Sequence, residues 1–217
     1  MIISHGRRYI FVHAPKTGGT SLALALEARA MKDDLMLGDT PKATKRRRRL
    51  KDVQAAGRLW KHSTLRNVEG PVTPDQMRDY FVFMLVRNPW DRMVSYYHWL
   101  REQSFDHPAV TLAKSSAFAD FLRAPATQAS FRATPYASYV TDGKGRELAD
   151  LFVRLEHVDE DLPALETHLG FSLRPLPHEN RSDREVDYRR FYTDELAEIV
   201  ANCCREDIRR FGYQFNG

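Results

Sequence analysis

The chain has 217 residues, enough for one domain with its own hydrophobic core, and 42% hydrophobic and 29% charged residues are ordinary for a soluble globular protein. The net charge of +4 is modest for a nucleic-acid binder, and no DNA- or RNA-binding motif is present. No run of about twenty apolar residues occurs, so the sequence predicts no membrane span. Cys203 and Cys204 are the only cysteines, and no Cys/His spacing indicates a zinc site.

The first apolar segment, residues 9–12, leads into a loop rich in glycine and hydroxyl side chains. That loop reads Pro15-Lys16-Thr17-Gly18-Gly19-Thr20-Ser21, and an amphipathic stretch follows at residues 22–28. The order predicts a buried strand, a tight loop and a helix. Adjacent glycines would let backbone N–H groups turn toward an anion, and the helix start adds donors and a positive dipole end. The segment therefore predicts a phosphate or phosphosulfate site, with a plain surface turn as the alternative. In the usual nucleotide P-loop the lysine follows the last glycine, whereas here Lys16 precedes both.

A second motif follows the nearly continuous apolar run at residues 79–86, which is typical of a strand covered on both faces. Asn88 is a suitable N-cap and Pro89 a suitable first helical residue. Arg87 is thus expected at the carboxyl end of the strand, where open α/β sheets bind ligands, and Ser95 on the helix that follows. An arginine and a hydroxyl that converge on one anion predict a second phosphate site. A capped structural helix with an arginine ion pair is the alternative.

The rest of the chain alternates between strand-like and helix-like segments. We expect a short strand at residues 59–63, a helix start with a capping box at 73–76, a helix at 89–103, a loop at 104–116, a helix at 117–123, a strand at 151–155, a helix at about 159–169 and a final helix from the cap Thr193 to about residue 210. This pattern predicts one α/β domain over residues 1–217, with a mostly parallel central sheet flanked by helices.

Together the two motifs resemble the sulfotransferases that use 3′-phosphoadenosine 5′-phosphosulfate (PAPS), and they are most similar to the carbohydrate branch of that family. The resemblance continues more weakly to the C-terminus. It implies a P-loop-like nucleotide-binding fold and transfer of a sulfuryl group from PAPS to a hydroxyl acceptor, a carbohydrate, with 3′-phosphoadenosine 5′-phosphate (PAP) as product. It assigns the 5′-phosphosulfate to Lys16, Thr17, Gly18, Gly19, Thr20 and Ser21, and the 3′-phosphate to Arg87 and Ser95.

The resemblance also bears on catalysis. Related glycan sulfotransferases place a catalytic histidine or glutamate after the second strand, and His62 is expected there as the general base, since an imidazole titrates near neutral pH. Lys16 is expected to stabilise charge on the leaving oxygen, with no metal required. A structural role for His62 is the alternative, and His13 is expected to support the loop. For the adenine pocket, family position suggests Tyr139 and residues 152–155, and Asn180 with Arg181 could close over the nucleotide.

Partners and compartment are further expectations. Eukaryotic members of the carbohydrate branch usually carry a membrane anchor and a stem, which this sequence lacks, so we expect a cytoplasmic, bacterial catalytic domain. The Arg46–Arg49 run is either an acceptor patch for an acidic glycan or a solvated face.

Two other function classes stay open. One is a P-loop kinase or NTPase, which would want a lysine after the glycines and a metal-binding aspartate. The other is a non-catalytic nucleotide- or polyanion-binding protein.

Overall fold

The structure, a computed structural model, describes residues 1–177 and 187–216, and the chain divides into two compact units. The sheet unit comprises Met1–Val86 and Tyr136–Asn180, and the helical unit comprises Arg87–Pro135 and Arg181–Gly217. Asn180 and Arg181, suggested for the nucleotide, lie outside the described residues. The organisation of the chain as a single domain stays a prediction.

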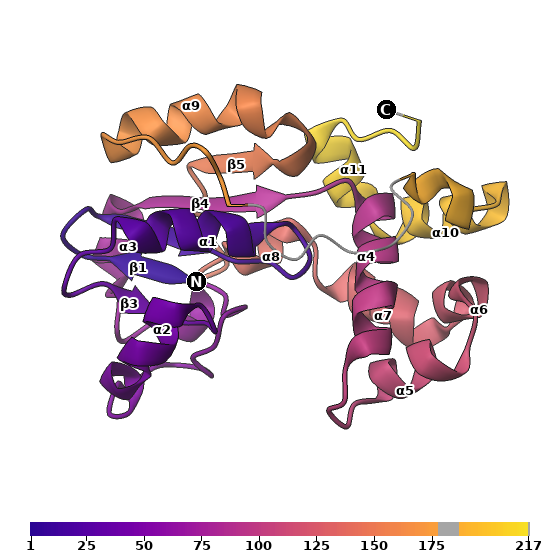
Figure 1. Cartoon of the computed structure of the whole chain (residues 1–217), viewed down its shortest axis with the longest axis horizontal. Helices are drawn as coiled ribbons and strands as arrows, with labels where there is room; N and C mark the ends of the chain where they lie inside the picture. Colours follow the sequence, from indigo (N-terminus) through magenta and orange to yellow (C-terminus); the bar gives the residue numbers. More distant parts are fainter. Residues whose placement is uncertain (178–186, 217) are drawn as a thin grey trace. The chain divides into compact units, whose positions relative to one another are not determined.

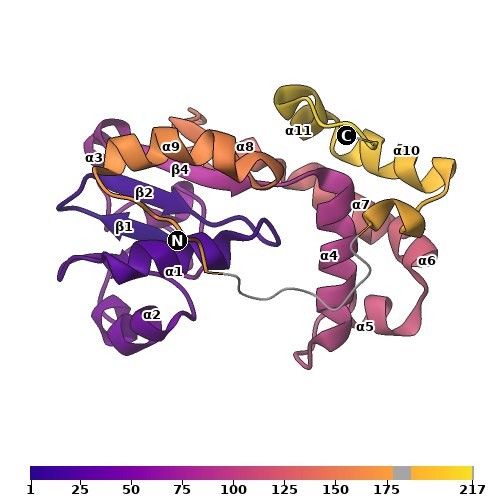
Figure 2. The same ribbon diagram turned by 45° about the horizontal axis from the view of Figure 1, so that its top comes forward.

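The sheet unit contains five strands that form one mixed sheet (Figure 1). They are β1 (Ile2–Ser4), β2 (Tyr9–Val12), β3 (Leu35–Met36), β4 (Phe81–Val86) and β5 (Leu151–Arg154). The spatial order is β3-β1-β2-β4-β5, and Figure 2 shows β1, β2 and β4 side by side. β2, β4 and β5 are parallel, whereas β1 is antiparallel to both β2 and β3. The α/β fold class is therefore confirmed, but the sheet is mixed rather than mostly parallel.

Five α-helices belong to the described residues of the sheet unit. They are α1 (Gly19–Ala28), α2 (Pro41–Arg46), α3 (Pro74–Asp79), α8 (Tyr136–Tyr139) and α9 (Val158–Leu169). Successive side chains of a strand point to opposite faces, so Phe11 and Phe83, which are register partners, share a face. Leu22 and Leu26 of α1 and Leu165 of α9 pack in the same buried cluster. Full burial of each such side chain stabilises the fold by about 1.5–3 kcal/mol, and this packing holds α1 on the sheet.

A buried carboxylate joins α1 to α2. Glu27, 7% exposed, accepts hydrogen bonds from the backbone N–H groups of Lys42 and Ala43 at 2.8 and 3.3 Å and from the hydroxyl of Thr40. These are the N-cap and first-turn residues of α2, whose backbone donors have no partner within the helix. The Glu27 carboxylate thus caps α2 from a neighbouring helix, which the sequence pattern does not reveal.

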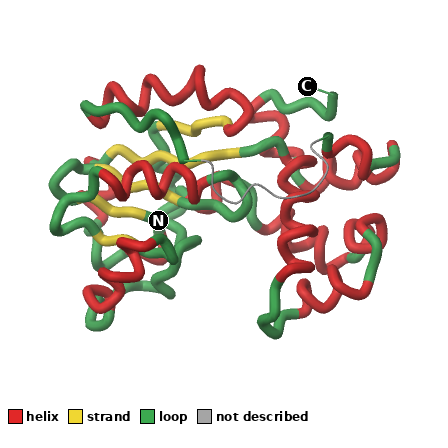
Figure 3. The backbone as a smooth tube through the Cα atoms, viewed as in Figure 1, coloured by secondary structure: helices red, strands yellow, loops and turns green. Residues whose placement is uncertain are grey.

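The described residues of the helical unit form helices joined by short loops (Figure 3). The α-helices are α4 (Pro89–Glu102), α5 (Pro108–Ser115), α6 (Phe118–Arg123), α7 (Pro125–Ala133), α10 (Asp194–Cys203) and α11 (Arg205–Phe211). Met93, Phe121 and Val200 lie in their shared core. Asn88 caps α4 by accepting from the N–H of Trp90 at 3.0 Å, as predicted. No helix of the described residues is long and apolar enough to cross a membrane.

Most predicted helix ends are confirmed, and three element predictions are wrong. The capping box at residues 73–76 begins α3, and Gly170 ends α9 in the left-handed conformation. Residues 108–115 form helix α5 rather than a loop, with Pro108 at its first position. The final helix is interrupted at Cys204, which separates α10 from α11.

The third wrong prediction is the strand at residues 59–63, which form a turn instead. The buried hydroxyl of Ser63 donates toward the carbonyl oxygens of Arg58 and Trp60, both at 2.9 Å, and accepts from the Trp60 N–H at 2.9 Å. A serine side chain that satisfies nearby backbone groups competes with strand pairing. These local bonds explain why the segment forms a turn rather than the predicted strand.

Candidate active site

The glycine loop, residues 14–19, connects β2 to α1. Gly18 is the N-cap of α1 with φ of 77°, and Lys16 has φ of 63°. Left-handed backbone at a residue with a side chain costs roughly 1–2 kcal/mol, so the surrounding fold must hold Lys16 in this conformation. The loop thereby places a cationic residue just before the N-terminus of a ten-residue helix. Helix dipole and backbone donors both favour an anion there.

Neighbouring side chains occupy the space beside both glycines of this loop. A methyl group at Gly18 would lie 2.8 Å from Cδ1 of Leu155, and one at Gly19 would lie 2.5 Å from Nε2 of His13. The sequence predicts glycines that expose backbone to an anion. In the structure, the space that their side chains would need is filled by Leu155, which directly follows β5, and by His13, which directly follows β2.

The hydroxyl residues of the loop fall into two groups. Thr17 is fully buried, and its Oγ1 donates to the carbonyl oxygen of Ala14 at 3.0 Å. Its side chain therefore supports the loop, and only its backbone could serve an anion. Thr20 and Ser21 lie in the first turn of α1 and are partly exposed. Their hydroxyls are at the helix N-terminus, as the sequence predicts.

His62 is hydrogen-bonded to His13, the residue directly before the glycine loop. Its Nδ1 lies 2.7 Å from the carbonyl oxygen of His13, and the two rings are 5.0 Å apart and nearly perpendicular. Because a carbonyl oxygen only accepts, this bond assigns the hydrogen to Nδ1. In the neutral ring Nε2 is then unprotonated, the state that a general base requires. His13 itself packs against Gly19 and stacks on Phe11, consistent with a supporting role.

Burial keeps both histidines neutral. It is the main cause that lowers the pKa of His62 to about 4, and the charge of Lys61 acts in the same direction. The hydrogen bond to His13 opposes this shift. Burial also lowers the pKa of His13 well below its usual value. At neutral pH the Nε2 lone pair of His62 is thus available, whereas an exposed histidine would be partly protonated.

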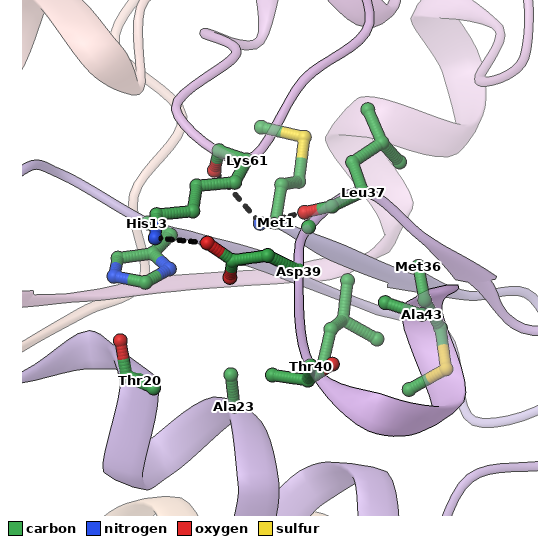
Figure 4. A pocket seen from close by; sticks show the side chains of 12 residues that line it. Met1, His13, Thr20, Ala23, Met36, Leu37, Asp39, Thr40, Ala43 and Lys61 are labelled. Carbon is green, nitrogen blue, oxygen red and sulfur yellow. Dashed lines mark hydrogen bonds and ion pairs between the residues drawn. The ribbon is translucent and has the colours of Figure 1, made fainter. Parts of the chain in front are cut away.

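A small hollow lies beside these rings in the sheet unit. His13, Thr20, Asp39 and Lys61 are among its lining residues, and Figure 4 shows them around it. Lys61 Nζ lies 2.8 Å from Asp39 Oδ2. Neither Asp39 nor Lys61 belongs to a motif of the sequence, and the only local signal is that Lys61 adjoins His62. The hollow puts a cation and a carboxylate next to the first turn of α1.

The second predicted motif lies in the helical unit. The guanidinium of Arg87 donates through Nε and Nη2 to Oδ2 of Asp91 at 2.8 and 2.6 Å, and the two side chains are 13% and 18% exposed. Ser95, 7% exposed, lies one helical turn beyond Asp91 on α4. The arginine ion pair that the sequence offers as an alternative is therefore present. This ion pair orients the guanidinium of Arg87.

Other predicted features have structural partners. Arg46 donates to the carbonyl oxygen of Met31 at 2.7 Å, and Arg49 donates to that of Lys32. Two of the four arginines of the Arg46–Arg49 run thus bind the backbone at residues 31–32. Tyr139 is buried, and its suggested place in an adenine pocket stays a prediction. Among the described residues, no group of three or more histidine, cysteine or carboxylate side chains could hold a metal ion.

Comparison with known proteins adds the decisive observation. The sequence profile of the sulfotransferase family matches residues 1–214. The chain belongs to the sulfotransferase family. Among solved structures, the mouse sulfotransferase SULT7A1 complexed with PAP matches with a TM-score of 0.53 and 16% identity over 95% of this chain and 86% of that chain. At this identity the likeness shows a shared fold. A search of curated proteins gave no match.

Membership of the sulfotransferase family confirms the enzyme class that the two motifs predict. The match is to the family as a whole, so the carbohydrate branch stays a prediction. The individual site residues also stay predictions.

The packing of His13 on Gly19 makes a coupled mutation test possible. Gly19→Ala should destabilise the protein by about 1–3 kcal/mol, because the added methyl group meets the His13 ring. His13→Ala removes that ring, so Gly19→Ala should cost much less in the His13→Ala background. Urea unfolding of the four variants measures the coupling. Additive effects would contradict the contact, and Gly38→Ala, whose added methyl group would meet only Cβ of Lys61 at 3.8 Å, serves as the control.

The pKa of His62 predicts acid sensitivity. Between pH 6.5 and about 4 the unfolded chain binds a proton at this residue that the folded chain does not, so stability falls as pH falls. Between pH 7.5 and pH 5 the free energy of unfolding should fall by about 1–2 kcal/mol because of this residue. His62→Asn, which can still donate to the His13 carbonyl, should reduce the acid sensitivity by that amount in urea unfolding. The exposed residue His157, replaced by asparagine, is the control, and equal pH slopes for wild type and His62→Asn would contradict the buried neutral state.

Proposed function

We propose that this member of the sulfotransferase family transfers a sulfuryl group from PAPS to a hydroxyl group of a carbohydrate. The observation that carries the proposal is the glycine loop. It holds Lys16 in a left-handed conformation before α1 and connects through His13 to His62. The bound PAP of the mouse sulfotransferase supports the choice of donor by likeness of fold.

The chemistry of the loop fits the phosphosulfate end of the donor. Lys16 supplies a positive charge, the first turn of α1 supplies backbone N–H groups, and Thr20 and Ser21 supply hydroxyls. We assign the 3′-phosphate to Arg87 and Ser95 of the helical unit. The ion pair of Arg87 with Asp91 supports this assignment because it fixes the direction of the guanidinium.

His62 is the proposed general base. Its Nε2 carries the free lone pair because its Nδ1–H is committed to the His13 carbonyl. The same hydrogen bond orients the ring with respect to the glycine loop. A general base must be unprotonated at the working pH. The pKa of about 4 keeps His62 unprotonated there and also makes it a weaker base than an exposed histidine.

The proposed step moves one proton and one sulfuryl group. When bound, PAPS supplies an activated sulfuryl group on a phosphate leaving group. Nε2 of His62 takes the proton of the acceptor hydroxyl while the oxygen of that hydroxyl forms the new bond to sulfur. Lys16 stabilises the negative charge that develops on the phosphate oxygen as the old sulfur–oxygen bond breaks. The products are the sulfate ester and PAP, and the proton leaves His62 to solvent.

No observation favours the two other function classes. The lysine of the glycine loop stands before both glycines, unlike that of a P-loop kinase or NTPase. The family match supports an enzyme over a non-catalytic binding protein. A carbohydrate acceptor rests on the motif resemblance.

The assignment of Arg87 predicts nucleotide preference. PAP at one hundred times its dissociation constant should stabilise the protein by about 2.7 kcal/mol, and adenosine 5′-monophosphate at the same concentration by much less. Arg87→Gln should weaken PAP binding about 10- to 100-fold, the effect of losing a charged hydrogen bond, and leave the monophosphate nearly unchanged. Thermal shift and isothermal titration measure both.

Asp91→Asn is the matched control for that test, because it removes the ion pair and keeps the guanidinium. It should retain most of the preference for PAP. Equal affinity of wild type for the two nucleotides would exclude Arg87 and Ser95 as the 3′-phosphate site.

The assignment of His62 predicts a specific pH profile. His62→Asn should lower turnover by about 10²–10⁴ and leave PAP binding nearly unchanged. In wild type the rate should fall only as pH drops through about 4, where Nε2 becomes protonated, rather than near 6.5. Circular dichroism at each pH shows whether the protein is still folded.

Lys16→Ala provides the comparison for His62→Asn. It should lower turnover by roughly 10²–10³ and leave the position of the acid limb unchanged, because it removes a charge and not the base. Near-normal turnover of His62→Asn would rule out His62 as the base.

A further inference from the structure

The turn that carries His62 also presents an exposed aromatic ring. Trp60 is 43% exposed and is one of few large apolar side chains at the surface of the described residues. The buried Ser63 hydroxyl fixes the backbone of this turn through its bonds with Arg58 and Trp60. The indole therefore stands on a rigid turn, so little conformational entropy would be lost if a ligand covered it.

The Trp60 ring lies next to the proposed base. The centroids of the Trp60 and His62 rings are 5.1 Å apart, and the planes are perpendicular at 89°. An acceptor ring resting on the indole would thus have its hydroxyl groups within reach of the imidazole. Because the two rings are in contact, a ligand that packs on Trp60 would also lie close to His62.

A positively charged side chain, Arg58, lies beside Trp60. The guanidinium of Arg58 lies over the Trp60 ring, 5.3 Å from its centroid. Lys61 on the same turn is neutralised by Asp39. No carboxylate of the described residues pairs with Arg58, so its charge is available to a ligand. An exposed indole with one uncompensated guanidinium selects a ring that bears an anionic group.

We propose that Trp60 and Arg58 form the acceptor-binding surface, on which a sugar ring with a carboxylate or sulfate group rests. The apolar face of the sugar packs on the indole, and the anionic group pairs with Arg58. This inference rests on the proposed function and specifies its acceptor as an acidic saccharide.

The exposure of the indole favours a sugar over a flat phenol. A phenol gains from an enclosed apolar pocket that covers both of its faces. The surroundings of Trp60 are instead polar, with Arg58 and His62 at its sides. A sugar has one apolar face for the indole and a rim of hydroxyl groups that solvent and these polar side chains can satisfy.

Fluorine NMR of the full chain labelled with 5-fluorotryptophan tests the proposal. The chain has three tryptophans, and the resonance absent from Trp60→Phe belongs to Trp60. The probes are an unsulfated tetrasaccharide of alternating glucuronate and N-acetylglucosamine, the neutral tetrasaccharide of N-acetylglucosamine, and 2-naphthol. All are titrated in the presence of PAP. Trp90, which is 5% exposed in the helical unit, is the internal control.

The acidic tetrasaccharide should shift the Trp60 resonance at lower concentration than the neutral one and leave the Trp90 resonance in place. Arg58→Gln should raise the dissociation constant of the acidic probe about fivefold, the scale of one exposed charge contact, and change that of the neutral probe less than twofold. Arg47→Gln, in the basic run, should leave both unchanged. Trp60→Ala should weaken both saccharides about tenfold, measured by isothermal titration.

Three results would overturn the proposal: no shift of Trp60 with either saccharide, tighter binding of 2-naphthol than of the acidic probe, or equal effects of Arg58→Gln and Arg47→Gln. The thermal shift with PAP separates this outcome from failure of the proposed function. A chain that binds PAP and fails these titrations is a sulfotransferase with a different acceptor surface. A chain that PAP does not stabilise contradicts the donor assignment itself.

Discussion

The hydrogen bond from Nδ1 of His62 to the carbonyl oxygen of His13 is the interaction on which the candidate active site depends. It joins a turn that has no secondary structure of its own to the residue that follows β2. The same bond sets the tautomer of His62, so one contact determines both where the proposed base lies and which nitrogen can accept a proton. Burial of the two rings then keeps His62 neutral.

Close packing around the glycine loop also positions the start of α1 relative to His13. The His13 ring fills the space beside Gly19, and Leu155 fills the space beside Gly18. The loop is therefore held from β2 on one side and from the end of β5 on the other. Such contacts can hold Lys16 in a backbone conformation that a lysine rarely adopts. The positions of the proposed base and of the proposed charge stabiliser are thus consequences of one packed cluster in the sheet unit.

Local signals account for the elements that were predicted correctly. Asn88 and the capping box at residues 73–76 satisfy backbone donors within a few residues, so the sequence alone reveals these helix starts. Residues 59–63 form a turn rather than the predicted strand because the buried Ser63 hydroxyl bonds to nearby backbone groups. The sequence also carries a start signal for α5, because Pro108 stands at the first helical position directly after the capping residue His107.

Residue types and short spacings are enough to predict the enzyme class, the order of strand, glycine loop and helix, and the two motifs. The packing of His13 against Gly19, the state of His62 and the exposure of Trp60 next to it depend instead on the folded chain. These features join residues as far apart as 49 positions in the chain. They follow from burial and close approach, which no local pattern specifies.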